Sequence, residues 1–217
     1  MAAPRSFRLL QMLLLPLIAI TGCTVQPYDY SALKAAKPHS ILVMPPVNNS
    51  LEVDAPYTFL ATISRPLAEK GYYVFPVVVI DQFLKENGLP TPLEMQAVPL
   101  EKIREIIGPD AVLYVTIEDW GQHYQLISSQ TVVSSRWRLV DARTGTVLWE
   151  GVARAVMSPG DSGAGLAGAL IAAVVNQVVG SVVDQTPELS RQANSTAIND
   201  RHRGLLPGPY GTRQLDK

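Results

Sequence analysis

The sequence predicts an α/β (α+β) fold: a single mixed-sheet sandwich with two βα units, then a three-strand antiparallel meander and a long C-terminal helix. Three observations predict it. Residues 40–109 alternate short apolar runs with stretches of helical spacing, the apolar period shortens from near four to two after Asp110, and apolar rows at spacing four follow Pro159. Right-handed crossovers are expected to place the early helices on one face of the sheet.

The run SILVM at residues 40–44 predicts a buried strand. The two prolines that follow predict its end, because proline donates no ladder hydrogen bond. The loop after the strand is a candidate contact surface, since its prolines fix its shape and its polar side chains offer hydrogen bonds. An ordinary strand-end turn is the alternative. The candidate contact residues are Pro45, Pro46, Asn48, Asn49 and Ser50.

Three helices and one short strand are predicted between this loop and the meander. Residues 55–71 form the first helix, with a terminal glycine as stop signal and Pro66 as the place of a kink or late restart. YYVFP at residues 72–76 predicts the second strand, and residues 77–88 and 99–110 predict two more helices. The apolar faces contain Phe59, Ile63 and Leu67 in the first helix and Ile103, Ile106 and Ile107 in the last.

Three segments with apolar residues at every second position predict the meander, namely residues 111–120, 130–140 and 146–156. Gly145 supplies the positive φ for the second turn, and residues 122–126 are expected to make the first bend. The core-facing residues are expected to be Leu113, Val115 and Ile117, then Thr131, Val133, Trp137 and Leu139, and finally Val147, Trp149, Ala153 and Ala155.

A long helix is predicted over residues 166–183. Apolar rows on one side and small residues on the other favour close packing, either against the sheet alone or with self-association into a homodimer as well. Asn176 and Gln177 at its centre argue against a membrane span. The polar composition afterwards predicts a surface-wrapping or partly disordered tail over residues 187–217. The candidate self-association row contains Leu166, Leu170, Val174 and Val178.

The N-terminal residues have the order of an export signal. Arg5 and Arg8 precede an apolar segment at residues 9–20, which is too short for a bilayer span of about 20 residues. The single cysteine of the chain follows directly. Its surroundings resemble the bacterial lipobox, an aliphatic residue and two small ones before the cysteine. The lipobox-like residues are Ile20, Thr21, Gly22 and Cys23.

This resemblance implies cleavage between Gly22 and Cys23 and acylation of Cys23 with chains such as palmitate. Several chains hold a protein at a membrane almost permanently, because each buried CH₂ contributes about 0.8 kcal/mol. The alternative is a secreted protein with a stray thiol. Thr24, by resemblance to sorted lipoproteins, implies the outer membrane. We therefore expect a signal peptide at 1–22, an irregular lipidated tether at 23–39, a periplasmic domain at 40–186 and the tail at 187–217.

Composition and motifs give little support to other classes of function. The net charge is −1 and the basic residues are scattered, so no nucleic acid partner is expected. The three histidines stand apart, which argues against a metal site and against a base for the serine in GDSG at residues 160–163. The glycines at 163–168 match a dinucleotide-binding pattern, but no parallel strand is predicted after them. Glu118 and Asp119 are neighbours that a strand sends to opposite faces. Neither a cofactor nor a catalytic residue is predicted.

Four stretches carry a resemblance to a known family: PPVN at residues 45–48, GYYVFP at 71–76, RLVDARTGTVLWEG at 138–151 and GLAGALIAAVVNQVV at 165–179. They resemble a family of proteobacterial lipoproteins typified by a Neisseria surface lipoprotein proposed as a vaccine antigen. The resemblance implies a fold like that of the amino-terminal domain of the Tol-system translocation protein and of curli-secretion lipoprotein relatives. It also implies that the protein is an accessory module found beside other lipoproteins. It implies no catalytic reaction.

The sequence thus predicts a lipoprotein anchored in the outer membrane and facing the periplasm. Its predicted function is that of a non-catalytic accessory or scaffold module in cell-envelope assembly or secretion, with the membrane and other envelope proteins as partners. One alternative is a periplasmic small-ligand-binding protein or enzyme that uses a cleft at the strand ends. Another is a structural subunit of a larger ring.

Overall fold

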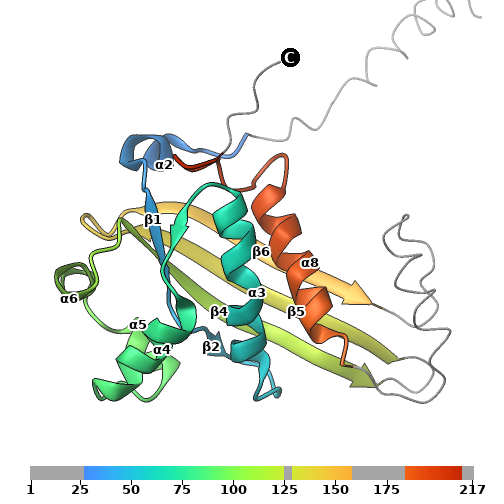
Figure 1. The fold of residues 1–217 in the computed structure, drawn as a ribbon. Helices are drawn as coiled ribbons and strands as arrows, with labels where there is room; N and C mark the ends of the chain where they lie inside the picture. The colour runs from blue at the N-terminus through green and yellow to red at the C-terminus, as the bar shows by residue number, and fades with distance from the viewer. Residues whose placement is uncertain (1–26, 125–128, 158–183, 212–217) are drawn as a thin grey trace, which may run out of the picture.

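The computed structural model describes residues 27–124, 129–157 and 184–211. These residues form one mixed sheet with helices packed on it, as the sequence predicts (Figure 1). The strand order is β3-β1-β4-β5-β6, and β2 pairs with β4 beyond the end of β1. The strands are β1 (Ser40–Val43), β2 (Val47–Asn48), β3 (Tyr73–Val74), β4 (Ala111–Tyr124), β5 (Ser129–Asp141) and β6 (Val147–Met157).

The parallel half of the sheet contains β1, with β3 on one side and β4 on the other. Helix α3 (Ala55–Glu69) connects β1 to β3, and α4 (Val77–Glu86), α5 (Pro92–Gln96) and α6 (Leu100–Ile106) connect β3 to β4. The predicted strands and helices of this region are confirmed. The sequence analysis missed α5, and it also missed β2, which lies in a segment predicted to be a loop. Helix α3 contains Pro66 within its length, so the helix does not restart there. Ile103 is buried, but Ile106 is 63% exposed, contrary to the prediction for α6.

The early helices lie on both faces of the sheet, so the expectation of a single face is wrong. Ile41 and Val43 on β1 pack in the core that contains α3, while Leu42 and Met44 pack against α4, α5 and α6. The reason is the strand order. The chain moves from β1 to β3 in one direction along the sheet and from β3 to β4 in the other, and right-handed connections in opposite directions cover opposite faces.

The antiparallel half is the predicted meander of β4, β5 and β6. Gly145 has a φ of 72° in the second turn, as predicted. Residues 122–124, where the first bend was predicted to start, belong to β4, which continues through Tyr124. Residues 125–128 lie outside the described residues. Val147 is 42% exposed rather than buried, because an irregularity in the β5–β6 pairing shifts the register there and puts Leu148 into the core beside Trp149.

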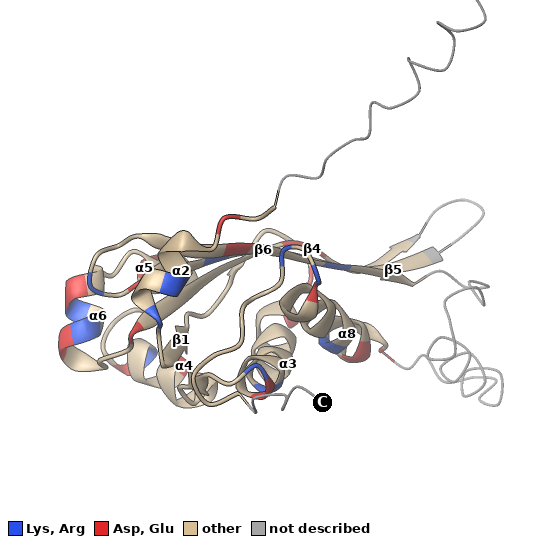
Figure 2. Ribbon diagram, turned by 90° about the horizontal axis from the view of Figure 1, so that it is seen from above, with Lys and Arg blue, Asp and Glu red and all other residues tan. Residues whose placement is uncertain are grey.

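The main core lies between the long strands and the helices α3 and α8 (Thr186–Asn199), which lie side by side across them (Figures 1 and 2). Phe59 of α3 makes an edge contact with Trp137 of β5, with ring centroids 6.0 Å apart. Trp149 of β6 lies at the same distance from Trp137. These rings fill the space between sheet and helices, so Trp149 is in the core as predicted.

The C-terminal part differs from the prediction. The helix predicted for residues 166–183, including Leu166, Leu170, Val174 and Val178, lies outside the described residues. Residues 187–199 were predicted to be part of a polar tail, but they belong to α8. Helix α8 buries several polar side chains with its few apolar ones, so its sequence gives a weak amphipathic signal. The buried residues are Thr186, Leu189, Ser190, Ala193, Asn194 and Ile198.

The predicted irregular tether is also partly folded. Residues 31–36 form helix α2 (Ser31–Ala36), and Leu33 is buried in the main core. Ahead of α2, the Tyr28 hydroxyl accepts a hydrogen bond from the Glu150 amide at 2.9 Å. The folded body therefore begins by Tyr28, which leaves only a short connection to Cys23.

Candidate functional site

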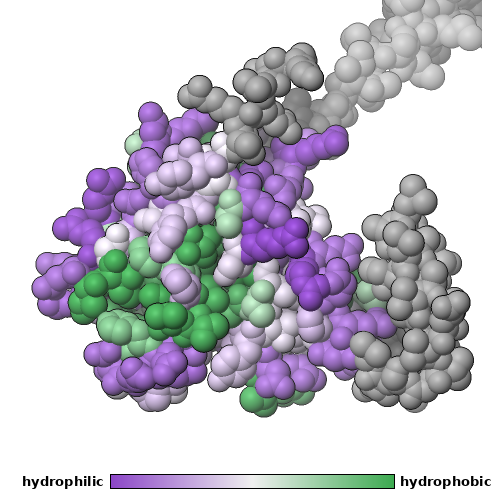
Figure 3. Space-filling view, in the orientation of Figure 1, coloured by the Kyte–Doolittle hydropathy of each residue, from purple (hydrophilic) through white to green (hydrophobic). Residues whose placement is uncertain are grey.

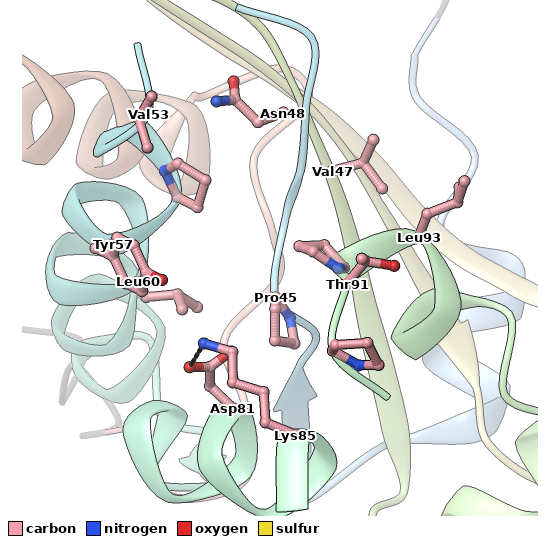
Figure 4. Close-up of a pocket in the computed structure, with 13 residues that line it drawn as sticks. Pro45, Val47, Asn48, Val53, Tyr57, Leu60, Asp81, Lys85, Thr91 and Leu93 are labelled. Carbon is pink, nitrogen blue, oxygen red and sulfur yellow. Dashed lines mark hydrogen bonds and ion pairs between the residues drawn. The ribbon is translucent and has the colours of Figure 1, made fainter. Parts of the chain in front are cut away.

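A groove opens at the carboxyl end of β1, between α3, α4, α5 and the loop after Pro45 (Figure 4). Its volume is about 360 Å³. We call it the proline groove, because four of its residues are prolines. It is lined by Pro45, Pro56, Pro90 and Pro92, by Val47, Val53, Tyr57, Leu60 and Leu93, and by the polar residues Asn48, Asp81, Lys85 and Thr91. Its position is the end of a parallel strand, where sheets of this type often bind ligands.

The loop on one side of the groove is held by Asn48. Its Oδ1 accepts hydrogen bonds from the Ser50 amide at 3.0 Å and the Ser50 hydroxyl at 2.7 Å, and its Nδ2 donates to the Glu52 carbonyl at 2.7 Å. These bonds stabilise a turn, which was the alternative interpretation of this loop. Within it, Val47 and Asn48 pair with β4 as the short strand β2.

The predicted contact residues divide into two groups. Pro45 and Asn48 line the proline groove, whereas Pro46, Asn49 and Ser50 do not. Pro46 is buried, and Ser50 is bonded to Asn48. The structure therefore brings part of the predicted contact loop to a concave surface, and a contact role for the loop stays a prediction.

Helix α5 forms a wall that the sequence analysis missed. Thr91 and Glu94 make a capping box: the Glu94 amide donates to the Thr91 hydroxyl, and the Glu94 carboxylate accepts from the Thr91 amide. The sequence TPLE carries this signal and could have predicted the helix start. Gln96 then fixes α5 in place, because its Nε2 donates to the carbonyls of Pro45 at 2.8 Å and Val115 at 2.9 Å.

The opposite wall contains the charged residues of the groove. Lys85 and Asp81, one turn apart on α4, form an ion pair with a distance of 2.6 Å between Nζ and Oδ2. The Lys85 ammonium also lies 5.4 Å from the ring centroid of Tyr57 on α3. The hydrogen bond to Asp81 raises the pKa of Lys85. These two charges satisfy each other, so neither is presented to a ligand without a partner.

Apolar side chains around the groove are strongly exposed. Leu51 is 99% exposed, Val53 79% and Leu93 70%, and Val78 and Val79 at the start of α4 are 70% and 62% exposed. In Figure 3, apolar surface gathers at the lower left around α4. Apolar surface of this kind beside a concave site is typical of protein contacts.

The groove residues lack a pair of groups suited to acid–base or nucleophilic catalysis. Asp81 is bound to Lys85, and the Thr91 hydroxyl donates to Glu94. The neighbouring acids Glu118 and Asp119 bind different partners, Arg136 at 2.8 Å and His123 at 2.8 Å.

The described residues contain neither a candidate metal site nor a candidate membrane span. Among residues 27–124, 129–157 and 184–211, no three His, Cys, Asp or Glu side chains are grouped so that they could hold a metal ion. Within those ranges no helix has both the length and the apolarity needed to cross a bilayer. Gly22 and Cys23 lie outside the described residues, so cleavage and acylation there stay predictions.

Comparison with protein families places most of the chain in one group. A family model described as "Putative lipoprotein GNA1162-like" matches residues 28–210. A protein from Neisseria meningitidis serogroup B named "Putative lipoprotein NMB1124/NMB1162" is 42% identical over 204 residues, which cover 92% of this chain and 95% of the relative.

A solved structure from the same family also resembles this chain. The crystal structure of lipoprotein GNA1162 from Neisseria meningitidis is 45% identical, with a TM-score of 0.55, and the match covers 66% of this chain and all of that one. A PelC dodecamer from Paraburkholderia phytofirmans is 12% identical, with a TM-score of 0.45, over 79% of this chain and 91% of that chain.

Proposed function

This chain belongs to the GNA1162-like lipoprotein family, and from that premise we propose that it acts by binding another protein of the cell envelope. In this proposal, acyl chains on Cys23 anchor it in the outer membrane, and the folded body faces the periplasm. It serves as a non-catalytic accessory or scaffold module in envelope assembly or secretion. Self-association through Leu166, Leu170, Val174 and Val178 stays a separate prediction.

The observation that carries the proposal is the apolar character of the proline groove and its surroundings. Its polar side chains are engaged with one another or with their own loop, while apolar side chains such as Leu93 and Val53 are exposed beside it. Exposed apolar surface is costly in water and is covered when a protein partner binds. Proline and aromatic residues lose little conformational entropy in such a contact.

A second candidate function is supported by the position and size of the same groove. It lies at the carboxyl end of β1, and a volume of about 360 Å³ is in the range of small-ligand sites. A ligand there would be largely apolar, since few polar groups converge on it. The two candidates make different predictions for crosslinking.

A photoreactive amino acid at position 93, in the groove, tests the main candidate in living cells. We expect one discrete protein adduct, identified by mass spectrometry, and its yield should fall at least tenfold when Val53→Asp is added. The matched control carries the same amino acid at Val152, which is 60% exposed on β6, and should give no such adduct. Equal adducts from both positions, or no protein adduct from position 93, would argue against the proposal.

Anchoring is tested separately by metabolic palmitate labelling. The wild-type protein should incorporate label and fractionate with outer membranes. Cys23→Ala should incorporate none and leave the membrane fraction. If both proteins are equally unlabelled, acylation of Cys23 is not the anchor.

A further inference from the structure

The membrane anchor and the folded body are joined by very little chain. Tyr28 is bound to β6 through the Glu150 amide, and its ring lies 4.7 Å from that of Tyr30. The Tyr30 hydroxyl in turn donates to the Gly204 carbonyl at 2.6 Å. Four residues lie between Cys23 and Tyr28, so five Cα–Cα steps join them. Even a fully extended chain of that length spans at most about 18 Å.

We propose that the end of the molecule formed by α2 and residues 200–211, here called the anchor end, lies against anionic lipid headgroups of the leaflet that holds the acyl chains. The proline groove then opens away from that leaflet, toward the periplasm. This inference rests on the proposed acylation of Cys23 and adds an orientation to it. Figure 1 shows α2 at one end of the molecule and β2, α4 and α5 near the other.

The side chains of the anchor end suit a headgroup layer. Lys34, Lys37, Arg201 and Arg203 are exposed, and Tyr210 is 67% exposed. Figure 2 looks down on this end, with basic residues in blue. Lys and Arg are attracted to anionic lipid surfaces, and tyrosine favours the headgroup level of a bilayer, where its ring and its hydroxyl both find suitable surroundings.

The acidic side chains at the same end accept hydrogen bonds from backbone amides. The Asp29 carboxylate accepts from the Ser31 amide at 2.8 Å, and the Asp200 carboxylate accepts from the amides of His202 and Arg203 at 2.8 and 2.7 Å. These hydrogen bonds lower the pKa of both carboxyl groups. Both acids are therefore charged, and backbone amides of their own loops satisfy them. Of the four basic side chains at this end, Arg203 lies over the Tyr28 ring, 5.7 Å from its centroid, and Lys34, Lys37 and Arg201 are exposed to solvent.

Helix α3 sets the distance between the anchor end and the groove. Its first turn carries Pro56 and Tyr57, which line the groove. Its last residues adjoin Lys70, whose carbonyl accepts from the Gly208 amide at 2.8 Å. The 15 residues of α3 span about 22 Å. The groove is thus held about one helix length from the surface that we assign to the membrane.

The test uses full-length acylated protein in vesicles that contain phosphatidylglycerol and a lipid with a spin label on its headgroup. Lys34→Cys and Leu93→Cys each introduce one thiol at an exposed position, because Cys23 is blocked by acylation. A fluorophore on each thiol reports contact with the quenching headgroups. We expect quenching at position 34 to exceed that at position 93 at least fivefold.

Two further variants separate the short connection from the charges. Insertion of 20 Gly and Ser residues after Thr24 gives a typical span of about 25 Å and should reduce quenching at position 34 at least twofold. Lys37→Asn with Arg201→Gln should also reduce it at least twofold in anionic vesicles. The charge change should have no effect in vesicles of phosphatidylcholine alone, where quenching at position 34 should be lower from the start. The insertion should reduce quenching at position 34 in both kinds of vesicle.

The outcomes distinguish this proposal from the proposed function. Protein that does not float with the vesicles would overturn the acyl anchor, and with it the orientation. Anchored protein with equal quenching at positions 34 and 93 would overturn the orientation alone. Anchored protein with the same quenching at position 34 in anionic and neutral vesicles would overturn the headgroup contact.

Discussion

Gly71 follows α3 in a backbone conformation that other residues rarely adopt. Its φ is +95°, and a Cβ added there would lie 2.0 Å from the Gly211 nitrogen. Gly71→Ala therefore strains the backbone and displaces residues 208–211. In this segment the Gly208 amide donates to the Lys70 carbonyl and the Tyr210 amide to the Gly71 carbonyl. We expect the free energy of unfolding to fall by about 2–4 kcal/mol, measured by urea denaturation.

Gly88 provides the matched control for this prediction. Its φ is +83°, but no described atom lies within 4 Å of a Cβ built there. For Gly88→Ala, the free energy of unfolding should fall only by the cost of the left-handed conformation, about 1 kcal/mol. Equal losses in the two variants would mean that the contact between Gly71 and residues 208–211 contributes nothing to stability.

Tyr72 predicts a loss of stability in alkali. Its side chain is buried and its hydroxyl donates to the Leu206 carbonyl at 2.8 Å. Burial disfavours the phenolate and raises the pKa to about 12, from 10.0 in the unfolded chain. The neutral phenol therefore stabilises the fold fully below pH 10, and this contribution is lost between pH 10 and about 12. The loss should be on the order of 2 kcal/mol in urea titrations.

Tyr72→Phe isolates this effect from the other tyrosines of the chain. It removes the hydrogen bond to Leu206 at every pH, at a cost of about 1 kcal/mol. The advantage of the wild type over the variant should then shrink and reverse as the pH rises from 10 to about 12, because only the wild type has a buried phenol to ionise. A constant difference up to pH 12 would contradict the assignment.

At the scale of elements, α3 and α8 are joined by a buried polar cluster. The Thr62 and Ser190 hydroxyls are 2.7 Å apart, and Asn194 Nδ2 donates to the Thr62 hydroxyl at 3.1 Å. Asn194 Oδ1 is buried and has no hydrogen-bond partner among the described residues. A buried acceptor without a partner costs free energy, so the cluster specifies how α8 is placed more than it stabilises that placement.

This cluster gives a test of α3–α8 packing. Thr62→Val alone leaves Ser190 and Asn194 with lost partners and should lower the free energy of unfolding by about 1–3 kcal/mol. Thr62→Val combined with Ser190→Ala and Asn194→Leu replaces the whole cluster by apolar groups and should recover most of that loss. Urea denaturation measures both. A triple variant less stable than the single one would show that the polar contacts are net stabilising.

The elements that the sequence predicted correctly are those whose periodicity is strong. β4, β5 and β6 alternate clearly, and α3 repeats its apolar residues every four positions. Helix α8 was missed because Ser190 and Asn194 occupy buried positions that a pattern search assigns to the surface. Helix α5 has only five residues, too few for a periodic signal, and only its capping box marks it.

At the scale of the whole molecule, the candidate site could be predicted only in part. The strand end at Pro45 was predicted from its prolines, and so was a cleft there as one alternative. The other walls come from α3, α4 and α5, and they meet only because the strand order sends successive helices to opposite faces of β1. That order depends on long-range pairing, which local spacing does not specify.

The last described segment, residues 200–211, accepts hydrogen bonds from Tyr30 near the start of the described chain and from two other aromatic side chains. Its removal is therefore expected to have a large effect on stability. A chain that ends at Asn199 lacks buried Leu205 and the carbonyls that accept from three aromatic side chains. Relative to a chain that ends at Gly211, we expect the free energy of unfolding to fall by about 4–5 kcal/mol, from one buried leucine and three hydrogen bonds. The lost bonds are those from Tyr30 to Gly204, from Tyr72 to Leu206 and from Trp149 to Arg203.

Urea denaturation followed by tryptophan fluorescence measures this loss, because the indole of Trp149 donates directly to the segment that is removed. The truncation also frees Tyr30, and with it the segment that starts at Tyr28 and leads to the anchor. A truncated chain that loses less than about 1 kcal/mol would mean that residues 200–211 cover the body without stabilising it. The anchor end would then be a loose appendage, and a rigid orientation of the groove could not be maintained through it.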